Sequence, residues 1–180
     1  MKASRTMTTR DLIFIGILSA LCVIATTIKI PLPTGGMVHL GSACLFTIAI
    51  LFGGVYAGFA GAIGSAFFDL LLGFSPYTIW SFIIKGGAGF LAGWIARGVW
   101  PESSHNQFHN QQRPTSLWRA LLGCIAAAIW TLGGYILAWW QVTGSLTIAF
   151  GNAPSSLITS GVGILAALLL APKLKKALKL

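Results

Sequence analysis

Residues 117–142 read LWRALLGCIAAAIWTLGGYILAWWQV, an apolar run interrupted by a single charge. In lipid, every backbone N–H and C=O must find its partner within its own segment, so an apolar run of about 20 residues is expected to form a membrane-spanning helix. Five other apolar blocks occur along the chain, at about 11–28, 40–52, 56–72, 77–95 and 153–171. We therefore predict an all-α fold: a single membrane domain over residues 1–180, built as a bundle of six transmembrane helices.

The composition excludes a soluble globular protein. Hydrophobic residues make up 56% of the chain and charged residues only 8%, whereas soluble domains carry about 25% charged residues. The three acidic residues are too few to cover a water-facing surface. The net charge of +9 does not indicate a nucleic-acid partner, because the basic residues gather at the ends of the chain and in one loop.

The basic residues also predict how the bundle is oriented. Residues 100–116 form one extended polar stretch, which divides the chain into four predicted helices and then two. If this loop and both termini are cytoplasmic, ten basic residues lie inside, and Lys29 alone lies in an outer loop, as the positive-inside rule favours. The ten are Lys2, Arg5, Arg10, Arg97, Arg113, Arg119, Lys173, Lys175, Lys176 and Lys179. We expect a multi-pass protein of a bacterial cell membrane with both termini in the cytoplasm.

Two ionisable residues fall inside predicted helices. Asp69 lies about one turn, and Lys85 about two turns, from the outer ends of the third and fourth helices, so the two are expected at similar depth. An ionisable group within a membrane span is costly and indicates a functional site by default. Two interpretations remain open. Asp69 and Lys85 form a buried pair that only ties two helices together, or one or both face a bound polar molecule.

The outer half of the bundle gathers aromatic and polar residues that suit a flat, polar ligand. Tyr135 and Trp139 are four residues apart and therefore share one face of the fifth helix. The candidate ligand-binding residues are His39, Asp69, Tyr77, Trp80, Lys85, Tyr135, Trp139 and Asn152. Simpler interpretations stay open, because Trp and Tyr near a membrane boundary often form an interfacial belt, and Asn152 could be a helix cap ahead of Pro154.

No enzyme motif stands out. The sequence has no phosphate-binding G-x-x-x-x-G-K-[ST] loop, no metal-spaced cluster of His and Glu, and no nucleophile elbow. We therefore predict no catalytic residue, metal or cofactor, and active transport would need a partner that hydrolyses ATP. Cys22, Cys44 and Cys124 lie in separate apolar blocks and are interpreted as small packing residues. A different class of function remains an alternative: a small intramembrane enzyme or membrane assembly protein that uses Asp69 and Lys85.

Small residues predict close helix packing. Glycine and alanine recur through the second, third and fourth blocks, where they let helix backbones approach one another. Gly16 and Ala20 form a small-xxx-small pair on the first helix. Because the bundle has enough small residues elsewhere, this pair is a candidate surface for docking an outside partner, with packing inside the bundle as the alternative.

Several motifs, in their order and spacing, resemble a known family. They are PTGGMVHLG at 33–41, LFGG at 51–54, GAIG at 61–64 followed by DLLLG at 69–73, and IIKG at 83–86. Together they resemble the substrate-binding S components of energy-coupling factor (ECF) vitamin transporters, in the riboflavin-type branch that includes members assigned to hydroxymethylpyrimidine or pyridoxine. The likeness covers residues 10–100 by motif, and 117–172 mainly by helix pattern and by Asn152.

The resemblance implies a six-helix protein that binds a vitamin near the outer face, in a pocket lined by the first, third and fifth loops and helices four to six. It also implies docking on a transmembrane coupling subunit that carries two ATP-binding cassette ATPases, through a small-xxx-small motif that maps to Gly16 and Ala20. The family more often has Ala at both positions, so Gly16 is a departure. The few aromatics and one lysine favour hydroxymethylpyrimidine or pyridoxine as the ligand, with riboflavin next.

Overall fold

A computed structural model of the chain describes residues 7–33, 36–98 and 116–178. Each predicted apolar block contains one helix: α1 (Thr9–Thr27), α2 (Gly41–Phe52), α3 (Gly54–Leu71), α4 (Thr78–Ala96), α5 (Leu117–Thr143) and α7 (Ala153–Ala177). The predicted helix ends lie within two residues of the observed ends, except that α7 continues past 171 to Ala177. Apart from Ser116, the polar loop predicted at 100–116 lies outside the described residues.

Four short elements that were not predicted connect these helices: β1 (Lys29–Pro31), β2 (Met37–His39), the 3-10 helix η1 (Ser75–Tyr77) and α6 (Leu146–Gly151). The strands pair antiparallel, with Lys29 opposite His39 and Pro31 opposite Met37. The segment between α1 and α2 is therefore a β-hairpin rather than an irregular loop. Proline opposes helix, but it fits an extended chain at the edge of a two-stranded sheet.

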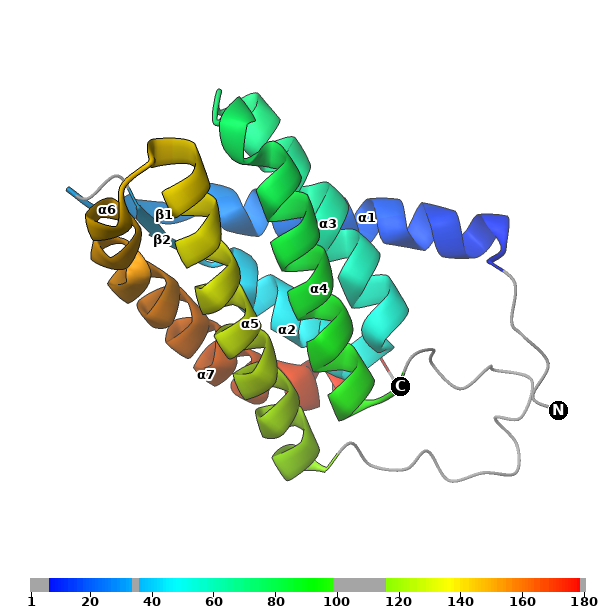
Figure 1. Ribbon diagram of the computed structural model, residues 1–180. Coiled ribbons are helices and arrows are strands. Elements are labelled where there is room, and N and C mark those ends of the chain that lie inside the picture. The colour runs from blue at the N-terminus through cyan, green and yellow to red at the C-terminus, as the bar shows by residue number, and fades with distance from the viewer. Residues whose placement is uncertain (1–6, 34–35, 99–115, 179–180) are drawn as a thin grey trace, which may run out of the picture.

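The short helix α2 lies at the centre of the bundle. Ten of its 12 residues are buried, and it contacts α1, α3, α4 and α7, as expected for a helix that is apolar on all sides. On the near side of the bundle, α4 lies between α3 and α5, while α6 and the β1–β2 hairpin lie together at one end (Figure 1). The connection between α1 and α2 and the connection between α5 and α7 therefore lie at the same end of the bundle.

Five helical segments are long and apolar enough to cross a membrane: Thr9–Thr27, Gly54–Leu71, Ser75–Ala96, Leu117–Thr143 and Leu146–Ala177. The sixth, α2, has 12 residues, which at 1.5 Å per residue give about 18 Å, against a hydrocarbon core of about 30 Å. Most of the surface of α2 therefore meets protein rather than lipid, since ten of its 12 residues are buried.

Glycines bring α3, α4 and α5 into close contact. A Cβ on Gly61 of α3 would lie 2.6 Å from the carbonyl oxygen of Lys85 on α4. A Cβ on Gly123 of α5 would lie 2.6 Å from the carbonyl oxygen of Ala92 on α4. Such backbone approach is how helices attract one another in lipid. The prediction that most of the small residues pack the bundle internally is confirmed at these positions.

Two glycines of α5 provide a matched test of this packing. Gly123→Ala should destabilise the protein by about 1–3 kcal/mol, because the new methyl group meets the rigid backbone of α4. Gly133→Ala should be neutral or slightly stabilising, because nothing lies within 4 Å of its Cβ position. Thermal unfolding of both variants in detergent measures the difference. Equal melting temperatures for the two variants would contradict the packing of α5 on α4.

Candidate functional site

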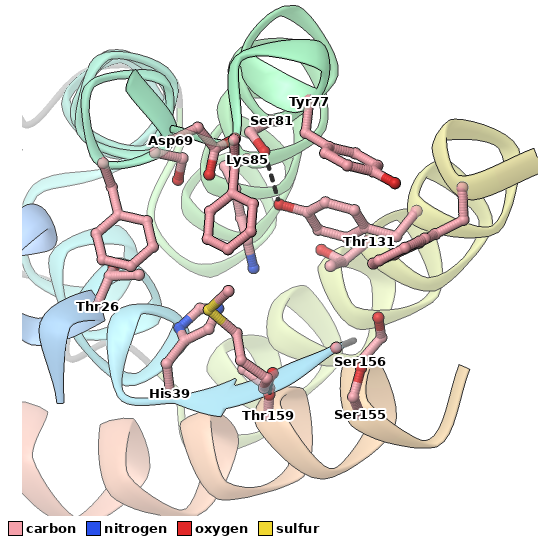
Figure 2. Close-up of a pocket in the computed structure, with 17 residues that line it drawn as sticks. Thr26, His39, Asp69, Tyr77, Ser81, Lys85, Thr131, Ser155, Ser156 and Thr159 are labelled. Atoms are coloured by element: carbon pink, nitrogen blue, oxygen red, sulfur yellow. Dashed lines mark hydrogen bonds between the residues drawn. The ribbon is translucent and has the colours of Figure 1, made fainter. Parts of the chain in front are cut away.

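A cavity of about 130 Å³ lies beneath the β1–β2 hairpin (Figure 2). Its walls come from β2, the C-terminal parts of α3 and α5, the N-terminal half of α4 and the start of α7. Six of the predicted ligand-binding residues line it: His39, Asp69, Tyr77, Lys85, Tyr135 and Trp139. Residues from both sides of the long polar loop therefore meet around one space.

Lys85 enters this cavity from α4 (Figure 2). Its side chain is only 5% exposed, and its Nζ donates a hydrogen bond to Oγ of Ser42 on α2 over 3.0 Å. The same Nζ lies 5.6 Å from the centre of the Tyr135 ring, close enough for a cation–π contact. Both partners are neutral, so among the described residues no counter-ion accompanies the ammonium group.

Asp69 reaches the same cavity from α3. It is 9% exposed, and its buried Oδ2 has no hydrogen-bond partner within the part of the chain that the structure describes. No ion pair joins it to Lys85, since the ammonium is directed to Ser42 instead. Asp69 and Lys85 share one cavity, as their predicted similar depth implies, and they attract each other without forming a direct ion pair.

The remaining walls are aromatic and hydroxylic. Tyr77 and Trp139 lie with ring centroids 4.9 Å apart and planes at 48°, so they offer an aromatic edge to the cavity. Ser81 and Tyr135 share a hydrogen bond of 3.2 Å between their hydroxyls. Further hydroxyls come from Thr26, Thr131, Ser155, Ser156 and Thr159. Neutral donors and acceptors of this kind suit an organic ligand with several polar groups.

His39 ends β2 and is neutral at physiological pH. Burial, helped by the positive charges of Lys85 and Lys29, lowers the pKa of its imidazole to about 3. The backbone N–H of Gly41 donates to Nδ1 of His39 over 3.1 Å, so the neutral ring must carry its proton on Nε2. His39 therefore brings one hydrogen-bond donor to the site.

Two predicted binding residues do not line the cavity. Trp80 is half-buried elsewhere on α4. Asn152, only 2% exposed, lies behind the hairpin, where a Cβ on Gly36 would come within 2.6 Å of its Oδ1. Its side chain donates to the carbonyl of Ile148 and makes no capping bond to α7. Asn152 therefore packs against the hairpin at Gly36 and connects it to the helix bundle.

The proposed docking residues lie away from the cavity. Gly16 and Ala20 are both exposed on α1, and a Cβ on Gly16 would meet nothing within 4 Å. Neither residue is needed for packing inside the bundle. A large apolar partner, or lipid, can therefore reach this face of α1.

Several lining residues escaped the sequence analysis. Ser155 and Thr159 are four residues apart on α7, a spacing that could have indicated a polar helix face. Met37 and Phe68 carried no such signal, because a single methionine or phenylalanine is ordinary in so apolar a chain. In the described parts of the chain, no three His, Cys, Asp or Glu side chains come together as a metal site would require.

Comparison with known proteins gives three findings. The sequence matches the family described as ECF-type riboflavin transporter, S component, over residues 6–176. It is 30% identical to an uncharacterised protein of Pyrococcus woesei over 118 residues, which cover 65% of this chain and 69% of that protein. It is 28% identical to the thiamine precursor transporter HmpT of Lactococcus lactis subsp. cremoris over 145 residues, covering 81% of this chain and 71% of the relative.

The fold is similar to that of a solved S component of a bacterial ECF transporter. The two structures align with a TM-score of 0.67 over 97% of this chain and 100% of the other, at 19% sequence identity. At this identity the match shows the fold alone. The resemblance seen in the sequence motifs is confirmed by these findings together.

The neutral His39 predicts how stability depends on pH. An unfolded histidine titrates near pH 6.5, whereas the folded one titrates near 3, so between these values the unfolded state binds the extra proton and stability falls as the pH is lowered. From about pH 6.5 to about pH 5 the loss is about 2 kcal/mol. His39→Gln, which keeps an acceptor for Gly41, should remove this part of the pH dependence. Unfolding of both proteins in detergent at the two pH values measures it, and identical losses would contradict the assignment.

Proposed function

The chain belongs to the family of ECF-type riboflavin transporter S components, and we propose that it binds a B-vitamin or vitamin precursor at the outer face of the membrane for delivery by an ATP-driven importer. The observation that carries this proposal is the cavity itself. Aromatic edges, hydroxyls and two ionisable groups converge there at the end of the bundle covered by the hairpin. Concave sites with apolar walls and a few placed polar groups are typical of small-molecule binding.

A single-ring ligand fits the cavity best. We propose hydroxymethylpyrimidine or pyridoxine first, with riboflavin next, because the cavity offers one aromatic pair, Tyr77 and Trp139, and one lysine, Lys85, to a ring. The relative named as a thiamine precursor transporter supports a pyrimidine-sized ligand. The proposed contacts are His39, Asp69, Tyr77, Lys85, Tyr135 and Trp139, with Asn152 acting through the hairpin.

We propose that six helices cross a cell membrane with both termini in the cytoplasm, and that α2 completes its crossing inside the bundle. Exposed tryptophans support a transmembrane position for α5. Trp118 and Trp140 are 73% and 42% exposed, and their spacing of 22 residues corresponds to about 33 Å of helix, close to the thickness of the hydrocarbon core. Tryptophan is enriched at both membrane interfaces.

Delivery requires partners. We propose a transmembrane coupling subunit and two ATP-binding cassette ATPases, with Gly16 and Ala20 as the contact on α1. S components are substrate-binding subunits of transporters, which weakens the alternative of an intramembrane enzyme or assembly protein that uses Asp69 and Lys85. Both side chains face the cavity, and ligand binding accounts for that position without a chemical step.

The direct test is to identify what the protein binds. Protein purified in detergent should retain, or take up, one equivalent of hydroxymethylpyrimidine, pyridoxine or riboflavin, detected by mass spectrometry of the released small molecule and by titration calorimetry. The ligand should raise the melting temperature, because it binds only the folded state. If none of the three binds or stabilises the protein, vitamin capture is wrong.

The docking role of α1 has a separate test. Gly16→Leu and Ala20→Leu should abolish vitamin uptake by cells that carry the coupling subunits, because a bulky side chain prevents close helix contact. Binding by the purified variants should be unchanged, since both positions are exposed and far from the cavity. Gly161→Leu on α7, also exposed with nothing within 4 Å of its Cβ position, is the matched control and should keep uptake. Full uptake by the α1 variants would exclude this docking surface.

A further inference from the structure

We infer that the ligand is zwitterionic: it presents a positively charged donor to Asp69 and a negatively charged acceptor to Lys85. The inference rests on the proposed function, because it concerns the ligand of the same cavity. It is carried by two ionisable side chains that line one cavity at membrane depth and form no direct ion pair with each other. Burying an unpaired charge is expensive, so such a group is expected to be matched when the site is occupied.

The first half of the inference concerns Lys85. Its ammonium group has three N–H donors, and the structure gives it one hydrogen bond, to the neutral Ser42 hydroxyl, and the face of the Tyr135 ring. Figure 2 shows its Nζ extending toward the open space between the walls. The remaining donors can therefore be satisfied from inside the cavity. An anionic oxygen on the ligand would supply both the acceptor and the missing charge.

The second half concerns Asp69. The side chain lines the cavity, and its buried Oδ2 has no hydrogen-bond partner among the described residues, so the carboxylate has an acceptor to offer a donor on the ligand. A neutral N–H or O–H on the ligand would satisfy the oxygen but not its charge. A cationic N–H satisfies both, and charge-assisted hydrogen bonds are about twice as strong as neutral ones.

The other groups around the cavity add no second counter-ion. His39 is neutral, and Tyr77, Tyr135 and the hydroxyl residues carry no charge in their ordinary forms. Lys29 is not one of the lining residues, and its Nζ lies 5.2 Å from the Phe68 ring centre. One anion and one cation thus face the ligand directly, which favours a ligand with one charge of each sign over an anion or a cation.

This charge pattern separates the candidate vitamins. A 3-hydroxypyridine ring, as in pyridoxine, exists in neutral water largely with its proton moved from the oxygen to the ring nitrogen, which gives N–H⁺ at position 1 and O⁻ on position 3 of one flat ring. The aminopyrimidine ring of hydroxymethylpyrimidine and the flavin ring of riboflavin are mainly neutral under the same conditions. A pyridoxine-type ring can therefore pair its cationic N–H with Asp69 and its anionic oxygen with Lys85. Tyr77 and Trp139 would contact the ring face, and the hydroxyl groups that line the cavity would bond the hydroxymethyl groups.

The test is calorimetric titration of the purified wild-type protein with four compounds: pyridoxine, 3-O-methylpyridoxine, hydroxymethylpyrimidine and riboflavin. Methylation of the 3-oxygen prevents the zwitterion but keeps the ring, so it should weaken binding by about 10- to 100-fold relative to pyridoxine. Pyridoxine should bind more tightly than hydroxymethylpyrimidine or riboflavin. This arm needs no variant and therefore does not depend on how well any substitution folds.

Three variants locate the effect. Asp69→Asn and Lys85→Gln should each weaken pyridoxine binding by about 10- to 100-fold and reduce the preference for pyridoxine over its 3-O-methyl form. Lys29→Gln removes a charge from a residue that does not line the cavity and should change affinity by less than about threefold. If Lys29→Gln weakened pyridoxine binding as much as Asp69→Asn or Lys85→Gln does, the effect would come from the overall charge near the cavity. Direct pairing of the ligand with Asp69 and Lys85 would then be wrong.

The two proposals fail in different ways. If hydroxymethylpyrimidine or riboflavin binds tightly and pyridoxine does not, or if 3-O-methylpyridoxine binds as well as pyridoxine, the zwitterion inference is overturned while vitamin capture stands. If none of the four compounds binds, the proposed function itself fails.

Discussion

A helix in lipid satisfies the hydrogen bonds of its own backbone, but it cannot shield a charged side chain from the hydrocarbon, and this constraint explains the arrangement of residues around the cavity. Lys85 and Asp69 are nearly buried, so each must face protein, water or a ligand rather than hydrocarbon. The structure turns both toward one cavity and leaves them unpaired within the described residues. The polar walls, the aromatic edge and the covering hairpin all surround this pair of charges.

Close helix packing holds the two charges in place. Gly61 of α3 lies against the backbone of α4 at Lys85 itself, so the approach of these two helices directly sets the position of the ammonium group. The central helix α2 supplies Ser42, which draws that group away from Asp69. The same small residues that stabilise the bundle in lipid therefore also keep the cavity open between α3, α4 and α5.

The positions of the long helices could be predicted from the sequence, because glycine and proline separate the apolar blocks and mark where each helix ends. Six of the binding candidates line one cavity, since ionisable and aromatic residues are conspicuous in an apolar chain, and their contact with a ligand stays a prediction. The sequence missed the hairpin, whose short strands carry no alternating pattern, and it placed Asn152 and Trp80 in a cavity that they do not line. Nor could it show that Cys22 and Cys44, in separate blocks, come within 3.8 Å of each other. Such details depend on how helices rotate about their axes, which composition does not specify.

The central claim is that the cavity beneath the hairpin is where the ligand lies, held between Asp69 and Lys85. The most direct measurement is an experimental structure of the purified protein with its bound molecule. The account predicts density for one flat ring beside Tyr77 and Trp139, with polar atoms within hydrogen-bond distance of Lys85 Nζ and of an Asp69 carboxylate oxygen. A ligand bound elsewhere on the protein, or a direct Asp69–Lys85 ion pair that excludes the ligand from both side chains, would contradict it.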